Sequence, residues 1–458
     1  MGAQLLQSSR CGFAAEPVSG TGISGETRSA EPHVKEYDLT GHNPRIPLYA
    51  RAALDTLSLS GDGDRLLCNL HDADWRNLLD FCDRTQLTLA FAQKCGDHTP
   101  GWVKRRLAKI LAQNAVRWDR IKLAFEECGS AFALADIPFA LLKGFSHCPD
   151  FIADPRLRAQ YDLDLLFLPR HLKQAYEAAL SLGFEPLGGF ERFPIDHLPT
   201  MIRKTGWEWR GDFFDTEIPV SLELHFRLWD GQTEQFAPGG LEAFWERRQV
   251  RELEGVRFLA LCREDLAGYS CLHILRHLLR GALRPSHVYE LALFLDRRYD
   301  DQAFWKSWET LHEPSLQRLE TIVFGLACRW FDCRLPACIQ DSMKSLPSEI
   351  GRWLERHGES PLVGLFHPNK DDLWLHWNLV NSLSARAGVI RRRMLPQRLP
   401  GAVEGIHRRN GSRTWRVRLA AAWTYLRFVV CRAKYHFFSV LPTLWSAFRW
   451  WSTRSEFR

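Results

Sequence analysis

The chain has 458 residues, of which 45% are hydrophobic and 25% charged, and a formal net charge of +6. This composition is typical of a folded globular protein and excludes a largely disordered chain, and the length has room for two to four domains. Twelve irregularly spaced cysteines exclude a small disulfide-stapled scaffold. We expect a cytoplasmic protein, because no basic segment followed by an apolar one opens the chain.

Charge is distributed unevenly along the sequence. Residues 386–458 contain 16 Lys and Arg residues but only two acids, a net charge of +14, so the remaining residues carry −8. This asymmetry predicts an anionic partner for the basic tail, either a membrane surface or a nucleic acid. Residues 1–45 are rich in Gly, Ser, Thr and Glu, and we expect them to be disordered.

Residues 46–130 show helical periodicity. Apolar residues recur at helical spacing within Trp75–Cys82, Val103–Leu111 and Trp118–Cys128. Gly129 is predicted to end the third of these helices. We therefore expect a helical lead-in region before the core of the protein.

Strand and helix patterns alternate through residues 131–250, which predicts an α/β core. The apolar runs 137–144 and 161–168 are predicted strands, and a helix is predicted from Leu172 to Gly183. In residues 220–226 apolar and polar residues alternate, which places Glu223 and His225 on one face of a strand. Residues 251–385 are predicted to be helical again, most clearly at 266–280 and 288–298.

Asp162 and Asp164 are separated by one residue within a predicted strand. Side chains two residues apart on a strand point to the same face, so both carboxylates can bind divalent cations together. Glu223, on the polar face of another strand, can supply a third carboxylate. Oxygen ligands of this kind suit Mg²⁺. The alternative is that both aspartates are solvated carboxylates on an exposed strand.

Lys143 and Gly144 end the preceding predicted strand. Glycine allows a phosphate to approach the backbone closely, and a helix beginning there would add amide donors and the positive end of its dipole. Lys143 and Arg158 could neutralise a triphosphate. These residues therefore form a candidate phosphate side of the same site.

Five motifs in order resemble a largely uncharacterised bacterial nucleotidyltransferase-like family within the DNA-polymerase-β-like superfamily. The motifs span residues 137–144, 154–158, 162–166, 182–184 and 222–227, and flanking helical motifs extend the resemblance from Leu66 to Arg298. It implies an α+β fold with a polymerase-β-like core, flanked by helical regions. It also implies that Asp162, Asp164 and Glu223 bind the metal and act in catalysis.

The same resemblance implies that Lys143, Gly144, Ser146 and Arg158 bind the nucleotide. The sequence departs from the superfamily here, because Phe145 separates Gly144 from Ser146 where Gly-Ser is usual. Glu223 and Glu290 also stand where Asp is more usual.

Other candidate ligands have simpler interpretations. His273 and His277 have the spacing of a two-histidine metal site but lack the glutamate of a His-Glu-x-x-His motif, so we expect a structural pair, hydrogen-bonded to Glu290. His225 could contact the acidic site. Cys328, Cys333 and Cys338 are spaced too widely for a typical zinc site and are expected to be buried thiols. Trp207 and Trp209 alternate as a strand does and are expected in the core or a cleft wall.

The tail, residues 386–458, contains an amphipathic pattern. Trp415, Leu419, Ala422, Leu426 and Val430 form one helical face, and Arg416, Arg427 and Lys434 gather on another. The longest uncharged run, residues 435–448, is shorter than the ~20 apolar residues that a spanning helix needs. Peripheral binding to the inner face of an anionic membrane, docking on the protein body and RNA binding all fit this pattern.

The sequence thus predicts Mg²⁺- or Mn²⁺-dependent transfer of a nucleotidyl group from an NTP to a hydroxyl or phosphate of an unknown small molecule, protein or RNA. An inactive nucleotide-binding or scaffold protein is one alternative, and an adaptor that acts through its basic tail is another. Intact acids at positions 162, 164 and 223 favour the enzyme.

Overall fold

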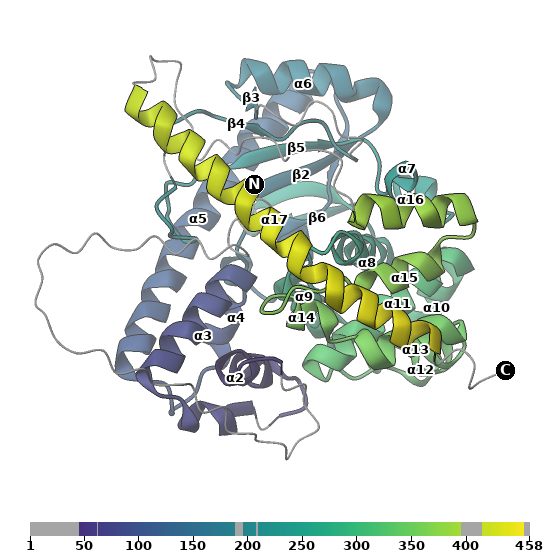
Figure 1. Ribbon diagram of the computed structural model, residues 1–458. Coiled ribbons are helices and arrows are strands. Elements are labelled where there is room, and N and C mark those ends of the chain that lie inside the picture. Colours follow the sequence, from purple (N-terminus) through teal and green to yellow (C-terminus); the bar gives the residue numbers. More distant parts are fainter. Residues whose placement is uncertain (1–44, 62, 188–195, 208, 395–414, 453–458) are drawn as a thin grey trace, which may run out of the picture.

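The computed structural model describes residues 45–61, 63–187, 196–207, 209–394 and 415–452 (Figure 1). The disorder predicted for residues 1–45 falls, apart from Arg45, outside these ranges. The described chain forms one mixed seven-stranded sheet with helices on both faces, which confirms the predicted α+β fold.

The strands are ordered β3-β4-β5-β2-β1-β7-β6 across the sheet. Two pairs are parallel, β2 with β5 and β1 with β7, and the other neighbours are antiparallel. The bounds are β1 (Phe139–Leu141), β2 (Asp162–Phe167), β3 (Glu185–Pro186), β4 (Met201–Ile202), β5 (Ser221–His225), β6 (Gln249–Leu253) and β7 (Val256–Ala260).

The helices fall into a lead-in group before the sheet, α6 and the short α7 between its strands, and a large group after it. The lead-in helices are α2 (Leu48–Leu57), α3 (Asp72–Thr85), α4 (Thr88–Lys94) and α5 (Gly101–Leu134). The others are α6 (Leu172–Ser181), α7 (Gly231–Glu234), α8 (Arg263–Leu279), α9 (Pro285–Arg297), α10 (Gln302–Leu311), α11 (Pro314–Phe331), α12 (Ala337–Lys344), α13 (Ser348–His357), α14 (Ser360–Val363), α15 (Asp372–Leu379), α16 (Leu383–Met394) and α17 (Trp415–Ser452).

One face of the sheet is apolar and is covered by α5 and α6. Leu163 and Leu165 of β2, with Leu222 and Leu224 of β5, pack in one cluster with apolar residues of these helices. The period of two along each strand therefore sends the intervening residues, which are mostly polar, to the opposite face. That second face lies toward α8 and α9 and carries the candidate site.

Three local predictions are wrong. Helix α5 continues through Gly129 to Leu134, because its apolar face stays buried against the sheet beyond the glycine. Trp207 and Trp209 do not belong to a strand, although Trp207 is buried against Tyr161 as a core residue. The hairpin of β6 and β7 follows at residues 249–260, where helices were expected from residue 251, and it extends the sheet beside β1.

A buried charge network joins α8 to α11. The imidazole of His312 lies between two carboxylates, 3.2 Å from Asp265 and 2.9 Å from Glu320, and all three side chains are fully buried. Trp308 donates a 3.0 Å hydrogen bond to Glu320. Burial disfavours the charged imidazole, but the two carboxylates outweigh it and raise the pKa of His312 to about 9.

This network should make stability depend on pH. The folded-state pKa is above the ordinary value near 6.5, so the stabilisation is complete below pH 6.5 and is lost as the pH rises through about 9. At 1.36 kcal/mol per pKa unit, the loss is about 3 kcal/mol. Urea unfolding should show that His312→Gln is destabilised more at pH 6.5 than at pH 9. The exposed control His98→Gln should follow the wild type, and an equal destabilisation of His312→Gln at both pH values would refute the linkage.

Candidate active site

The parallel pairing of β2 with β5 brings the predicted acids together. Its register sets Asp162 opposite Ser221 and Asp164 opposite Glu223. Residues directly opposite one another in a ladder project to the same side of the sheet, so all three carboxylates lie on the face toward α8. The geometric expectation that the three acids share one face is therefore met.

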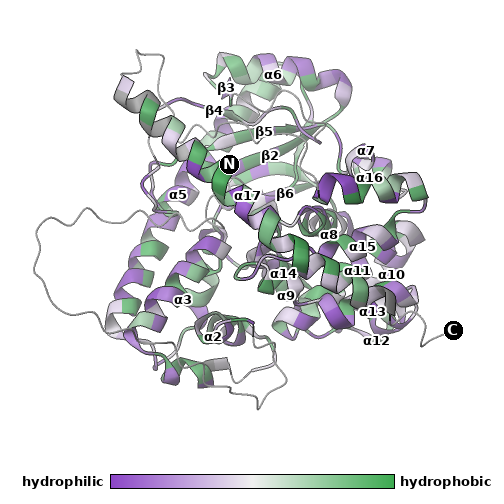
Figure 2. Ribbon diagram, viewed as in Figure 1, coloured by the Kyte–Doolittle hydropathy of each residue, from purple (hydrophilic) through white to green (hydrophobic). Residues whose placement is uncertain are grey.

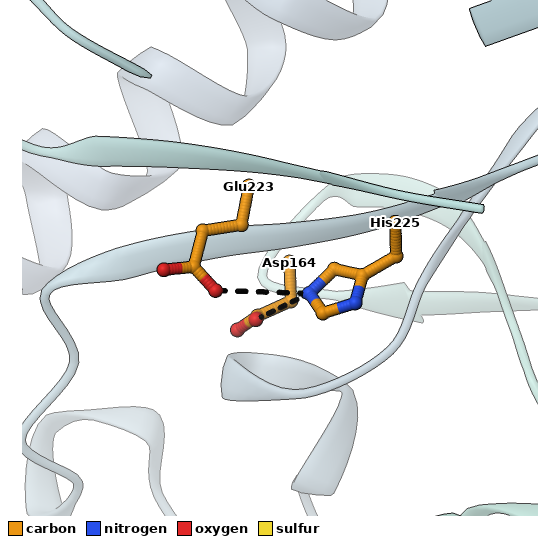
Figure 3. A group of neighbouring side chains, drawn as sticks. All are labelled: Asp164, Glu223 and His225. Carbon is orange, nitrogen blue, oxygen red and sulfur yellow. Dashed lines mark hydrogen bonds and ion pairs between the residues drawn. The ribbon is translucent and has the colours of Figure 1, made fainter. Parts of the chain in front are cut away.

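Asp164 is the centre of the site. Its carboxylate is almost fully buried and lies 2.8 Å from the Lys143 ammonium and 3.0 Å from Nε2 of His225. Figure 3 shows the His225 ring beside both acids, and its Nε2 also lies 3.7 Å from the Glu223 carboxylate. Lys143, predicted to face nucleotide phosphates, thus contacts an acid in this structure, and His225 does touch the site.

Two residues in the segment before β4 position the Glu223 side chain. The hydroxyl of Thr200 donates a 3.0 Å hydrogen bond to one carboxylate oxygen, and Nε2 of His197 lies 3.7 Å from the other. Both residues precede β4, which pairs with β5. This support fixes the glutamate side chain beside Asp164.

Further groups missed by sequence reasoning position His225. Its Nδ1 lies 3.4 Å from Asp196, which is also paired with Arg276 of α8. Tyr269, about two turns earlier on α8, is buried nearby. The polar residues Tyr269, His273 and Arg276 recur at helical spacing along α8, and that stripe was the available signal. The sequence around Asp196 carries none.

The buried acids differ in their proton affinity. Burial raises the pKa of Asp162, and the negative charges of Asp164 and Glu223 add to the shift. Burial acts in the same direction on Asp164, but Lys143 and the hydrogen bond from His225 hold its pKa below the ordinary value. Burial likewise acts on Glu223, yet His197 and His225 hold its pKa well below the usual range. Asp162 is therefore the acid that most readily takes up a proton.

The residues predicted to bind nucleotide phosphates lie around the end of β1. Gly144 has φ of +74°, and a Cβ there would lie 2.2 Å from the Gln160 amide nitrogen. The buried hydroxyl of Ser146 donates to the Lys143 carbonyl at 3.2 Å, so it serves the local turn. Arg158 and Lys143 line a common cavity of about 10 Å³, room for about one water molecule.

Glu290 organises the far side of that cavity. Its carboxylate lies 3.1 Å from Arg158 and 2.9 Å from His147, and these partners outweigh burial and lower the pKa of Glu290 to about 2. It is therefore not the expected partner of His273. His273 instead accepts a 3.0 Å hydrogen bond at Nδ1 from Arg276.

The three cysteines form no ligand group in the described part of the chain. Cys333 is buried as predicted, but Cys328 and Cys338 are partly exposed. Among the described residues the group able to hold a metal ion is Asp164, Glu223 and His225, whose ligand atoms lie within 4.8 Å of one another. Two carboxylates suit Mg²⁺ or Mn²⁺, and Asp196 lies 3.4 Å from the other ring nitrogen of His225, on the side where metal-bound histidines commonly have a carboxylate.

Comparison with known families identifies the class of protein. The family described as "Uncharacterised nucleotidyltransferase" matches residues 71–332, more than half of the chain. The chain therefore belongs to this nucleotidyltransferase family, as its motifs suggested. No curated protein and no solved structure matched the chain in the other two comparisons.

Substitution of Gly144 tests whether the Gln160 side chain can move without a loss of stability. In Gly144→Ala the new methyl group must displace the Gln160 amide, which donates a 2.8 Å hydrogen bond to the Asp162 carbonyl. Gly183 has φ of +82° and free space around it, so Gly183→Ala measures the backbone strain alone, about 1–2 kcal/mol. Urea unfolding should show a further loss of about 1–2 kcal/mol in Gly144→Ala. Equal losses in the two variants would mean that Gln160 moves freely.

Proposed function

We propose that this protein transfers a nucleotidyl group from an NTP to a hydroxyl or phosphate of an acceptor, with Mg²⁺ or Mn²⁺ bound at the acidic face of the sheet. The observation that carries the proposal is the convergence of three carboxylates with Lys143 in a nucleotidyltransferase family member. The acceptor class, whether small molecule, protein or RNA, is left to experiment.

Asp164 and Glu223 would hold the metal, with Asp162 and His225 beside them. When bound, the cation would polarise the phosphoryl oxygens and stabilise the charge that develops during in-line displacement. Lys143 supplies a second positive charge at the same carboxylate. Because catalysis of phosphoryl transfer is mainly positioning and electrostatics, these fixed charges account for most of what the chain contributes.

A proton must leave an acceptor hydroxyl during transfer. Glu223 is a poor proton acceptor, since its histidine neighbours hold its pKa well below the usual range. Asp162 has a raised pKa and lies on the same face of the sheet. Glu223 is fixed by Thr200 and belongs to the group that would hold the metal, whereas Asp162 does not, so we assign acceptance of the proton to Asp162 and a positioning role to Glu223.

Removing either aspartate charge should abolish transfer. Asp162→Asn and Asp164→Asn keep the side-chain shape but should lower the rate at least ~100-fold, because the first removes the proposed proton acceptor and the second a carboxylate ligand of the metal. The assay incubates the purified full chain with each labelled NTP, Mg²⁺ or Mn²⁺, and cell extract, and then identifies the labelled product. Asp80→Asn, an exposed carboxylate on α3, is the control and should match the wild type. Labelling that persists in both site variants would refute the assignment.

A second proposal concerns α17, which runs as a long rod across the front of the view in Figure 1. One face docks on the body: Tyr435 donates to the Asn369 carbonyl at 2.9 Å, and Trp374 donates to Ser446 at 2.9 Å. The predicted docking is therefore part of the structure. None of the helices in the described ranges is long and apolar enough to cross a membrane.

The opposite face of α17 carries large apolar side chains that are exposed, and Figure 2 shows hydrophobic positions recurring along this helix. The exposed large residues are Trp415, Leu419, Trp423, Leu426, Val430, Phe437, Phe438, Leu441, Leu444, Trp445 and Phe448. So large a stripe marks an interaction surface. Arg427 and Lys434 are also exposed along it, and we infer that the occupant is an anionic membrane surface.

Vesicle co-sedimentation tests this inference. The wild type should bind anionic vesicles, and binding should fall steeply with salt, since each basic residue contributes ~1 kcal/mol near an anionic leaflet. Arg427→Gln with Lys434→Gln should weaken binding at low salt, whereas Trp423→Ser with Phe437→Ser should remove the salt-resistant part. Lys104→Gln with Lys173→Gln, exposed on α5 and α6, is the matched charge control. Binding to RNA but not to vesicles would overturn the membrane assignment.

A further inference from the structure

Arg284 is a buried cation at the edge of the proposed active site. It precedes the first residue of α9 and is only 9% exposed. One guanidinium nitrogen donates a 3.1 Å hydrogen bond to the Gln86 side chain, while Nε has no hydrogen-bond partner. Within the described ranges, the structure records no ion pair for this arginine.

A buried guanidinium lowers the stability of the fold unless an anion lies close to it. A buried charge without a counter-ion destabilises a fold by several kcal/mol. Burial lowers the pKa of Arg284, and the charge of the Asp162 carboxylate opposes this shift most strongly, although the described residues show no ion pair between the two. By contrast, Lys143 and Arg158 already have carboxylate partners, Asp164 and Glu290. Arg284 is therefore the basic group of the site with its charge still uncompensated.

The first turn of α9 adds further unused donors. The hydroxyl of Ser286 and Nδ1 of His287 are buried without hydrogen-bond partners. The amino-terminal end of a helix also carries a partial positive charge that favours anions. His287 lines the small cavity together with Lys143, Arg158 and His273, so this residue of the turn reaches the phosphate side of the site.

Three histidines lie beside this turn. The ring centroids of His273 are 4.4 Å from His277 and 4.8 Å from His287. Burial, together with nearby Lys and Arg side chains, lowers the pKa of all three well below the ordinary value. They are neutral rings that can each donate one hydrogen bond, so they can serve an anion without adding to the buried positive charge.

We propose that Arg284 and the first turn of α9 bind phosphate oxygens of a substrate in this site, an assignment that rests on the proposed nucleotidyl transfer. The guanidinium fork matches two phosphate oxygens at once, a geometry that a lysine cannot reproduce. The phosphate would supply the missing counter-ion for Arg284, and the hydroxyl of Ser286 and the imidazole of His287 would complete its hydrogen bonds.

The test measures phosphate binding without metal or turnover. Calorimetry with tripolyphosphate and the metal-free full chain should show that Arg284→Gln binds about 10- to 100-fold more weakly than the wild type, because a charge-assisted hydrogen bond is lost. Arg284→Lys should be intermediate. Arg334→Gln, which removes an arginine paired with Asp296 at the surface, is the matched control and should bind normally. Without phosphate, Arg284→Gln should melt at the same temperature as the wild type or higher.

Competition distinguishes the two sources of phosphate. Displacement of tripolyphosphate by ATP supports a pocket for the nucleotide, and displacement by glycerol 3-phosphate supports one for an acceptor phosphate. Unchanged tripolyphosphate affinity in Arg284→Gln, or in Arg284→Lys if the first variant does not fold, overturns the proposal. If Arg284→Gln binds tripolyphosphate more weakly as expected but the wild type labels no acceptor, only the transfer reaction is refuted. If transfer is lost in Asp164→Asn but the tripolyphosphate affinity of Arg284→Gln is unchanged, only the phosphate pocket is refuted.

Discussion

The Asp164 carboxylate lies between the Lys143 ammonium and the His225 imidazole, and the charge balance of the polar face is built around it. Burying a carboxylate is tolerable only when it is paired and hydrogen-bonded. Lys143 comes from the end of β1 and His225 from β5, so three adjacent strands must be in register for the site to exist. Asp196 and Arg276 extend the same balance to α8.

The three carboxylates of the site differ in proton affinity and are therefore suited to different roles. The positive neighbours keep Asp164 and Glu223 ionised, which suits cation ligands, while Asp162 has a raised pKa and can exchange a proton. Pairs of carboxylates pushed apart in pKa are a recurring feature of sites that carry out acid–base chemistry. On the opposite side of the cavity Glu290 compensates Arg158, which leaves Arg284 as the charge for a substrate to neutralise.

Helix α17 leaves most of its large apolar side chains exposed, although Phe428 and Trp450 are buried. Small polar residues, Ser439 and Thr443, are buried on its inner side, while large apolar residues are exposed on the outer side. The docked side combines these hydrogen bonds with apolar contacts, since Trp450 belongs to the main core cluster and Phe428 is buried. The proposed membrane contact rests on the aromatic side chains that stay exposed.

The sequence by itself determined the features that depend on local periodicity. Alternation along the strands placed Asp162 on the same face as Asp164, and Glu223 on the same face as His225, because successive side chains of a strand point to opposite faces of the sheet. It could not determine that β5 lies parallel to β2 with Asp164 opposite Glu223, nor that Asp196, Arg276 and Arg284 approach from distant segments. Strand order, register and the docking of α8 and α9 are decided by long-range burial of apolar faces, which brings together residues whose local sequence carries no sign of their partners.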